Sequence, residues 1–164
     1  MKKHWFLRAV CLLCALALAP VAGLAETVQI TNLPTVYITL NDGKTVDQIT
    51  KTDRLPGTLS LAAGEQSFAD AAITIKGRGN STWQLPKKPY QIKFESKTDL
   101  LGMGKAKKWL LLANYWDKTL LRNAVTYDLA NKTDKGFSVE WRFVDLVING
   151  EYRGNYLLTE KNRI

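Results

Sequence analysis

Residues 72–83 read AITIKGRGNSTW, a short β-like run that ends in two glycines on either side of an arginine. Gly77 and Gly79 can adopt positive φ angles and let the backbone come close to a ligand. Successive N–H groups in such a turn can form a concave anion site, and Arg78 adds a planar guanidinium that suits phosphate or carboxylate. The stretch therefore predicts an anion-binding loop. The alternatives are a β-hairpin turn without a ligand and an Arg78 that pairs with a surface carboxylate such as Asp70.

A second β-like run, 90–94, follows this turn and contains Lys93. A glycine turn followed by a lysine on a strand is the order of elements in the nucleotide-binding half of protein kinases. The alternative is that Lys93 is the solvent-facing residue of an amphipathic strand, because Ile92 would then face the core. Lys87 and Lys88 compete with Lys93 for the role of phosphate ligand.

The rest of the chain is rich in β patterns and contains one clear helical pattern. Asp117 is a good N-cap for a helix over 118–132, where apolar residues recur at helical spacing. The Asn149-Gly150 pair predicts a tight hairpin turn. Further strands are predicted at 28–40, 71–75, 90–94, 139–147 and 152–158. This order of strands, one main helix and a hairpin predicts an α+β fold with a mostly antiparallel sheet.

The first 25 residues predict a secretory signal peptide rather than part of the fold. They combine a basic start, an apolar run over 9–19 and small residues before position 26. The apolar run is too short for a membrane span, so no transmembrane segment is expected after removal of the signal. A lipoprotein signal that uses Cys14 is the alternative. The only other cysteine, Cys11, also lies here, so we expect a secreted or cell-surface protein without disulfides, redox motif or cysteine metal site.

The charge of the chain limits the kinds of partner. The whole sequence has 23 Lys and Arg, 15 Asp and Glu and a net charge of +8. Removal of the signal would leave 20 basic and 15 acidic residues, a net charge of +5. Such a balance suits a phosphate ligand, an acidic cell wall or an anionic membrane surface equally well. Without a dense basic run, the sequence of an exported protein does not predict nucleic-acid binding.

Four motifs occur in one order: RGNSTW at 78–83, KKPYQIKF at 87–94, WLLLANYWDK at 109–118 with LRN after it, and INGEYRGNYLLTE at 148–160. Together, the stretch from about Ala72 to Glu160 resembles the amino-terminal part of the spore coat protein H (CotH) kinase family. The resemblance divides the chain into a signal peptide (1–25), a β-rich leading segment (26–70) and a nucleotide-binding lobe (71–164). It implies a fold like the amino-terminal lobe of an atypical protein kinase.

The resemblance also implies a function and a set of binding residues. Family members bind ATP and a divalent metal such as Mg²⁺, and some phosphorylate serines of coat proteins, so an exported protein substrate or cell-surface component is the implied partner. The turn would lie beside the phosphates, Lys93 would pair with the α- and β-phosphates, and backbone groups at Thr159 to Lys161 would hydrogen-bond the base. The implied nucleotide-binding residues are Gly77, Arg78, Gly79, Asn80, Ser81, Lys93 and Glu160.

The sequence also departs from a standard kinase pattern. The turn lacks a third glycine, the predicted helix has no glutamate to pair with Lys93, and no His-Arg-Asp or Asp-Phe-Gly run occurs up to Ile164. We therefore assign no catalytic or metal-binding residue and expect this lobe to be incomplete and inactive alone. The alternative function is a non-catalytic extracellular module that binds cell-wall glycan or a partner protein.

Overall fold

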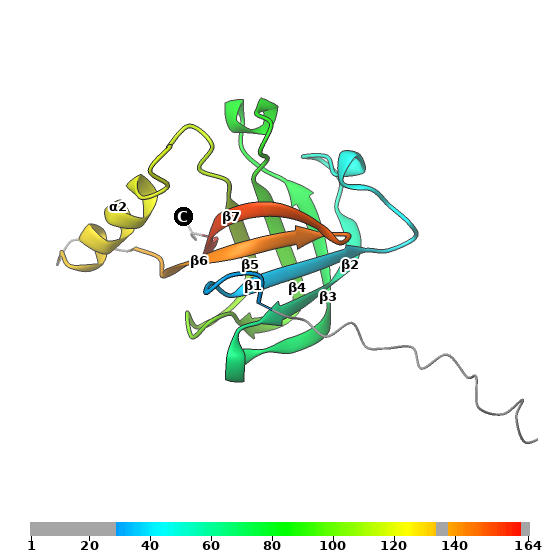
Figure 1. The fold of residues 1–164 in the computed structure, drawn as a ribbon, viewed down its shortest axis with the longest axis horizontal. Helices are drawn as coiled ribbons and strands as arrows, with labels where there is room; N and C mark the ends of the chain where they lie inside the picture. The colour runs from blue at the N-terminus through cyan, green and yellow to red at the C-terminus, as the bar shows by residue number, and fades with distance from the viewer. Residues whose placement is uncertain (1–28, 134–137, 162–164) are drawn as a thin grey trace, which may run out of the picture.

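In the computed structural model, residues 29–133 and 138–161 are described, and they form a closed β-barrel with one α-helix packed on its outside (Figure 1). The strands are β1 (Thr35–Leu40), β2 (Leu55–Ala62), β3 (Phe68–Gly77), β4 (Tyr90–Asp99), β5 (Lys105–Leu112), β6 (Trp141–Ile148) and β7 (Glu151–Glu160), and the helix is α2 (Arg122–Asn131). Short 3₁₀-helices lie in the connections at η1 (Val46–Gln48), η2 (Gly64–Gln66) and η3 (Ser81–Gln84). Within these described ranges, no helix has the length and apolar character needed to span a membrane.

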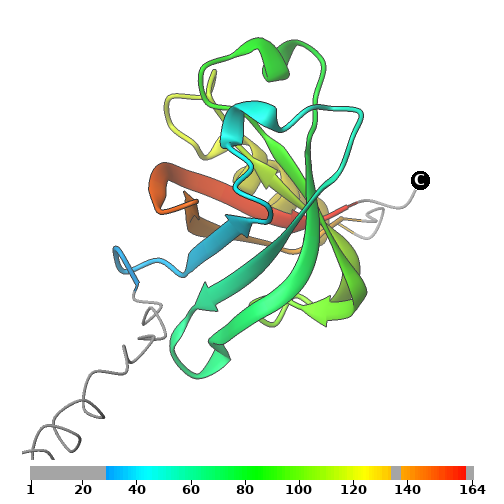
Figure 2. The ribbon, with the colours of Figure 1, turned by 90° about the vertical axis from the view of Figure 1, so that its right-hand side faces the viewer.

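The strands follow one another around the barrel in the order β1-β2-β3-β4-β5-β7-β6, and β6 returns to β1. Neighbouring strands are antiparallel except for β1 and β6, which pair in parallel from Thr35 opposite Asp145 to Ile38 opposite Ile148. A view turned by 90° shows the strands wrapped around a common interior, with the helix on the far side (Figure 2). Strand β3 spans residue 70, so strands before and after this position belong to one sheet.

The predicted α+β fold, with a sheet like that of a kinase amino-terminal lobe, is wrong. The sheet closes into a seven-stranded barrel, and the described residues contain a single α-helix. The reason is the parallel pairing of β1 with β6, two strands that lie more than 100 residues apart in the chain. Closure leaves the sheet without an unpaired edge. Alternating apolar residues identify a strand, but they do not reveal which distant strand will pair with it.

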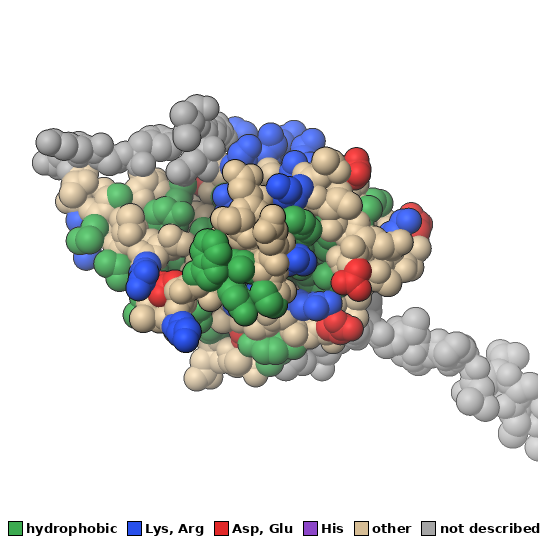
Figure 3. All heavy atoms as spheres, turned by 90° about the horizontal axis from the view of Figure 1, so that it is seen from above, with side chains coloured by type: hydrophobic (Ala, Val, Ile, Leu, Met, Phe, Trp, Pro, Cys, Tyr) green, Lys and Arg blue, Asp and Glu red, His purple; other side chains and the backbone are tan. Residues whose placement is uncertain are grey.

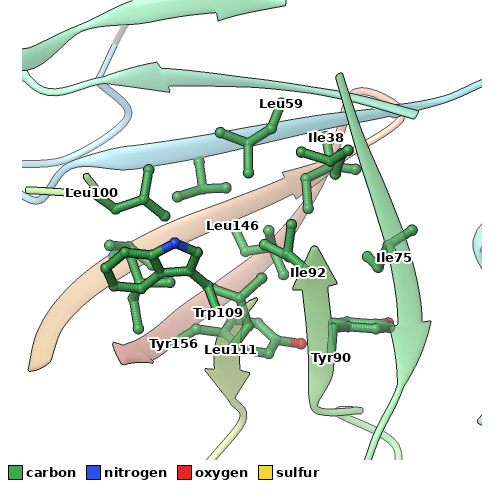
Figure 4. Packing of buried hydrophobic residues seen from close by; sticks show 14 of the residues in the cluster. Ile38, Leu59, Ile75, Tyr90, Ile92, Leu100, Trp109, Leu111, Leu146 and Tyr156 are labelled. Carbon is green, nitrogen blue, oxygen red and sulfur yellow. The ribbon is translucent and has the colours of Figure 1, made fainter. Parts of the chain in front are cut away.

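The barrel interior is filled by apolar side chains that alternate with outward-facing residues along each strand. On β4, for example, Ile92 and Phe94 are buried while Lys93 between them is exposed. The largest fully buried side chains are those of Trp109 and Tyr156 (Figure 4). A second, smaller apolar cluster of Leu112, Ala124 and Leu157 lies on the outside of β5 and β7, where it holds α2 against the barrel.

Helix α2 begins later than its sequence pattern predicts. Leu120 has a φ of 61°, a left-handed conformation that an α-helix cannot contain. Asp117 nevertheless helps to start the helix, because its Oδ2 accepts the N–H of Arg122 (2.8 Å) and its Oδ1 accepts the N–H of Thr119 (3.1 Å). The connection from β5 to α2 is therefore a hydrogen-bonded turn, and it places the helix beside the loop that follows β3.

The buried tyrosines predict a loss of stability in alkaline solution. Burial raises the pKa of Tyr156 and Tyr90 above the value of about 10 for an exposed tyrosine. A group whose pKa is higher in the folded state contributes its full stability below the unfolded-state pKa and loses it as the pH rises. We expect the urea midpoint of unfolding to fall as the pH rises above about 10.

Urea denaturation at a series of alkaline pH values, with tyrosinate absorbance recorded in parallel, measures this effect. The variant Tyr156→Phe should show a flatter pH dependence, although it also loses the bond from the Tyr156 hydroxyl to the Lys88 carbonyl (3.0 Å). Tyr115→Phe is the matched control, because Tyr115 is 46% exposed. Equal pH dependence in all three proteins would contradict the prediction.

Candidate functional site

Two adjacent cavities on the outside of the barrel form what we call the groove. The first, of about 440 Å³, lies between the loop after β3, the loop after β5 and the start of α2. The second, of about 290 Å³, follows the outer faces of β4, β5 and β7 as far as Glu160 and Lys161. Three residues line both cavities: Arg78, Leu112 and Tyr127. The combined volume of the two cavities is in the range of small-molecule binding sites.

The register of the sheet builds the floor of the second cavity. Gln91 on β4 lies opposite Leu110 on β5, and Leu110 lies opposite Thr159 on β7. These three residues point away from the barrel interior, because their neighbours along the strands belong to the core. A row of side chains from three strands thus faces the space beneath Tyr127 of α2.

Arg78 is the charged residue at the junction of the two cavities. Its backbone N–H donates to the Pro89 carbonyl (3.2 Å), which holds it at the end of β3. The side chain is half-buried, and burial lowers the pKa of its guanidinium, with Tyr127 acting in the opposite direction. Among residues 29–133 and 138–161, no hydrogen-bond or ion-pair partner contacts this guanidinium, and Asp70 instead accepts a hydrogen bond from Ser60. A half-buried cation without a counter-ion therefore faces the groove.

The two glycines of the turn serve the packing of the loop. A Cβ on Gly77 would lie 2.8 Å from Cε3 of Trp83 and closer still to two other ring atoms, so the indole occupies the space above this glycine. Gly79 has a φ of +86°, and a Cβ there would collide with the Thr82 hydroxyl. Asn80 and Ser81 are exposed at the start of η3. None of the residues Gly77, Gly79, Asn80 and Ser81 lines either cavity, so of the predicted turn residues the structure brings only Arg78 to the groove.

The competing lysines have very different surroundings. Lys87 lines the first cavity, its ammonium donates to the Asn155 carbonyl and lies 4.6 Å from the centre of the Tyr156 ring, and burial lowers its pKa. Lys88 points elsewhere and donates to the carbonyls of Trp83 (2.9 Å) and Leu85 (3.2 Å).

Lys93 is exposed on the outer wall of the barrel, directly opposite Lys108. It lines neither cavity. The structure therefore places Lys87, and not Lys93, on the same cavity as Arg78.

The far end of the groove contains the last of the predicted residues. Glu160 ends β7 and lines the second cavity, and the N–H of Lys161 donates to the Lys108 carbonyl (2.9 Å). The structure thus brings Arg78 and Glu160 to the lining of one cavity.

Several residues of the groove were not among the predicted ones. They are Gln91, Asn114, Asn123 and Tyr127. In the lining of the first cavity, the Nδ2 of Asn123 donates to the Oδ1 of Asn114 (2.8 Å). Asn114 belongs to the ANYWDK motif and Asn123 to the LRN motif. The spacing of these two motifs was therefore the feature of the sequence that could have identified both residues as part of the site.

The described residues do not fit a resident metal ion. In the ranges 29–133 and 138–161, no group of three or more His, Cys, Asp or Glu side chains comes together. Asp117 is the acidic residue on the first cavity, and both of its oxygens already accept hydrogen bonds. The hydrogen bond from the Thr119 hydroxyl, followed by that from the Arg122 N–H, lowers the pKa of Asp117. Its carboxylate is therefore used to build the turn before α2.

Comparison with known proteins identifies the family of this chain. The family model described as CotH kinase protein matches residues 75–162, more than half of the 164 residues. No curated protein matched the sequence. The matched range contains the RGNSTW turn, strands β4 to β7 and helix α2, which together supply the walls of the groove. On this match, the chain belongs to the CotH kinase protein family.

Proposed function

We propose that the groove binds ATP and that the protein takes part in phosphoryl transfer to serine or threonine of an exported protein. The observation that carries this proposal is the half-buried guanidinium of Arg78, which has no anionic partner among the described residues and faces both cavities. A partly desolvated arginine favours a bound anion, and its planar fork matches the oxygens of a phosphate.

The residues of the first cavity suit a triphosphate. Arg78, Lys87 and Arg122 supply three positive charges against one negative charge from Asp117, whose Oδ1 lies 3.7 Å from the Arg122 Nε. The amides of Asn114 and Asn123 add neutral polar groups. Figure 3 shows Lys and Arg side chains beside apolar ones on the face seen from above. Bound ATP would supply the phosphoryl group, and the side chains of this chain would hold and orient its phosphates.

The second cavity suits the remainder of a nucleotide. Its walls include Leu110, Leu112, Tyr127 and Val139, which offer apolar surface to a flat ring. Because Arg78 lines both cavities, one elongated ligand can occupy them together, with its charged end in the first. This arrangement supports a nucleotide better than a compact anion, which would fill the first cavity alone.

Export is the second part of the proposal. The basic start and short apolar run of residues 1–25 support a signal peptide, and this segment lies outside the described residues. An exported protein or a component of the cell surface is the proposed partner, in agreement with the net charge of +5 that would remain after residue 25.

Removing the guanidinium should weaken nucleotide binding. We expect Arg78→Ala to lower the affinity for a non-hydrolysable ATP analogue by about tenfold or more, because hydrogen bonds to charged groups contribute about 1.5–3 kcal/mol. Isothermal titration calorimetry at low and high salt measures this, and the difference should shrink as salt screens the charge. The role of Lys93 stays a prediction, and Lys93→Ala and Lys87→Ala are titrated alongside.

The structure favours a loss of affinity in Lys87→Ala and little change in Lys93→Ala, since only Lys87 lines the first cavity. Unchanged affinity in Arg78→Ala would contradict the proposal. A loss confined to Lys93→Ala would instead place the phosphates on the outer wall beside Lys108.

A third cavity supports the alternative function, that of a glycan-binding module. Trp141 and Phe143 of β6 meet edge to face, with ring centres 5.3 Å apart, and line a space of about 410 Å³ together with Asp128 and Glu140. Aromatic faces with nearby carboxylates suit a sugar, so this cavity supports a glycan-binding module. Retention on insoluble cell-wall glycan that is lost in Trp141→Ala, together with no nucleotide binding, would favour this second function over the first.

A further inference from the structure

The floor of the second cavity contains a side-chain amide that forms no hydrogen bond with the described residues. Gln91 is 7% exposed, and it lines the cavity from β4, where it lies between Leu110 on β5 and Lys76 on β3. No group among residues 29–133 and 138–161 forms a hydrogen bond with its side chain, and its amide nitrogen and oxygen are not fully buried, so they stay open to the cavity. Polar side chains in folded proteins usually have a hydrogen-bond partner, so an amide left open toward a cavity is available to a ligand.

The surroundings of Gln91 leave its amide as the free neutral polar group on the cavity floor. Thr159, the next polar residue in the same row, uses its hydroxyl to donate to the Glu140 carbonyl (2.8 Å). Leu110 lies between Gln91 and Thr159, and Leu112 and Tyr127 add further apolar surface. A ligand in this cavity would therefore meet apolar walls and one carboxamide that offers a donor beside an acceptor.

We propose that the carboxamide of Gln91 reads the purine base of the nucleotide, a role that rests on the proposed function. An amide group can pair with two adjacent positions of adenine, accepting from the exocyclic N6–H and donating to a ring nitrogen. The apolar side chains of the cavity cover the faces of the base, and the shared position of Arg78 joins the base to the phosphates in the first cavity. Gln91 is then a specificity residue, separate from the charged residues that hold the phosphates.

The experiment measures the binding of the base and the binding of the phosphates separately. The purified 164-residue chain is titrated with ATP, with adenosine and with inorganic tripolyphosphate, and the same is done for Gln91→Leu, which keeps the size of the side chain without the amide. We expect Gln91→Leu to bind ATP and adenosine about tenfold more weakly and tripolyphosphate with unchanged affinity. Gln91→Glu, which keeps the shape and replaces the donor, should also weaken adenosine binding.

The matched control is Gln84→Leu, because Gln84 is exposed on η3 and lines no cavity of the groove. It should bind all three ligands like the unaltered protein, and circular dichroism should show that each variant is folded. Equal ATP affinity in Gln91→Leu and the unaltered protein would overturn the role of Gln91, as would a parallel loss of tripolyphosphate binding.

The same titrations separate failure of the inference from failure of the proposed function. If the unaltered protein binds ATP no more tightly than tripolyphosphate, the base has no site and the inference falls, while the phosphate site stands. If the unaltered protein binds neither ligand, the proposed function falls and the inference falls with it.

Discussion

Replacing Gly77 by alanine is expected to lower the free energy of unfolding by about 2–3 kcal/mol, within the usual cost of overpacking a well-packed site. The new methyl group would enter the space taken by the Trp83 indole, which lies over Gly77 and meets the Tyr90 ring edge to face (6.2 Å). Gly77 is also held in place from the backbone, because its N–H donates to the Thr50 carbonyl (2.7 Å). The glycine therefore cannot move away from the indole without losing this bond.

Equilibrium denaturation followed by tryptophan fluorescence measures the effect of Gly77→Ala. The control is a double-mutant cycle with Trp83→Ala, in which the alanine at position 77 should cost far less because the indole is gone. Equal costs of Gly77→Ala in the two backgrounds would show that Trp83 is not the reason for the glycine. The result matters for the groove, because a Gly77 variant that loses nucleotide binding would do so through the loop and not through a lost ligand contact.

Replacing Asn149 by alanine is expected to cost about 3 kcal/mol of folding stability. Its side-chain Oδ1 accepts the N–H of Leu40 (2.9 Å) and its Nδ2 donates to the Lys44 carbonyl (2.8 Å), so two hydrogen bonds of about 1 kcal/mol each are lost. Asn149 also has a φ of 51°, and alanine in this left-handed conformation costs about a further 1 kcal/mol. The cost should be large because these bonds lie at the seam where β1 meets β6.

Two further substitutions divide this cost into its parts. Asn149→Gly removes both side-chain bonds and tolerates the positive φ, so it should cost about 2 kcal/mol. Asn149→Asp keeps the acceptor for Leu40 and should cost the least. Thermal unfolding of the four proteins gives the order directly. If Asn149→Ala and Asn149→Gly were as stable as the unaltered protein, the side chain would have no part in closing the barrel.

The Asn149-Gly150 turn shows which contributions of a turn residue to stability could be predicted from the sequence and which could not. The Asn149-Gly150 pair predicted a hairpin turn, and β6 and β7 do meet there, with φ angles of 51° and 81° at the two residues. The bonds of Asn149 to Leu40 and Lys44 could not be predicted, because those partners lie more than 100 residues earlier. A local pattern contains the information for a turn, but it contains none for the distant backbone that a turn residue will contact.

The residues of the candidate site also divide into those that the sequence predicted and those that it did not. Arg78 and Glu160 were predicted from their motifs, and both line the groove. Lys93 was predicted from its place on a strand after the glycine turn, yet alternation directs it outward beyond the edge of the groove, beside Lys108. Gln91 was not predicted, because alternation places it on the outer face, where a polar residue is ordinarily solvated. Gln91 is nevertheless only 7% exposed, and Tyr127 of α2 lines the same cavity on this face of the barrel.

The sequence by itself determined the family, most of the strands, the hairpin at Asn149 and the presence of a helix after Asp117, although the helix begins later than predicted. These features depend on residues a few positions apart, and a short segment of sequence is enough to show their spacing and backbone preferences. Only the tertiary structure decided that the sheet closes into a barrel, that Trp83 fills the space above Gly77 and that Arg78 and Gln91 share one groove. Those outcomes depend on which strand edges meet and on which outer face the helix covers, and both are set by the burial of apolar surface between distant segments.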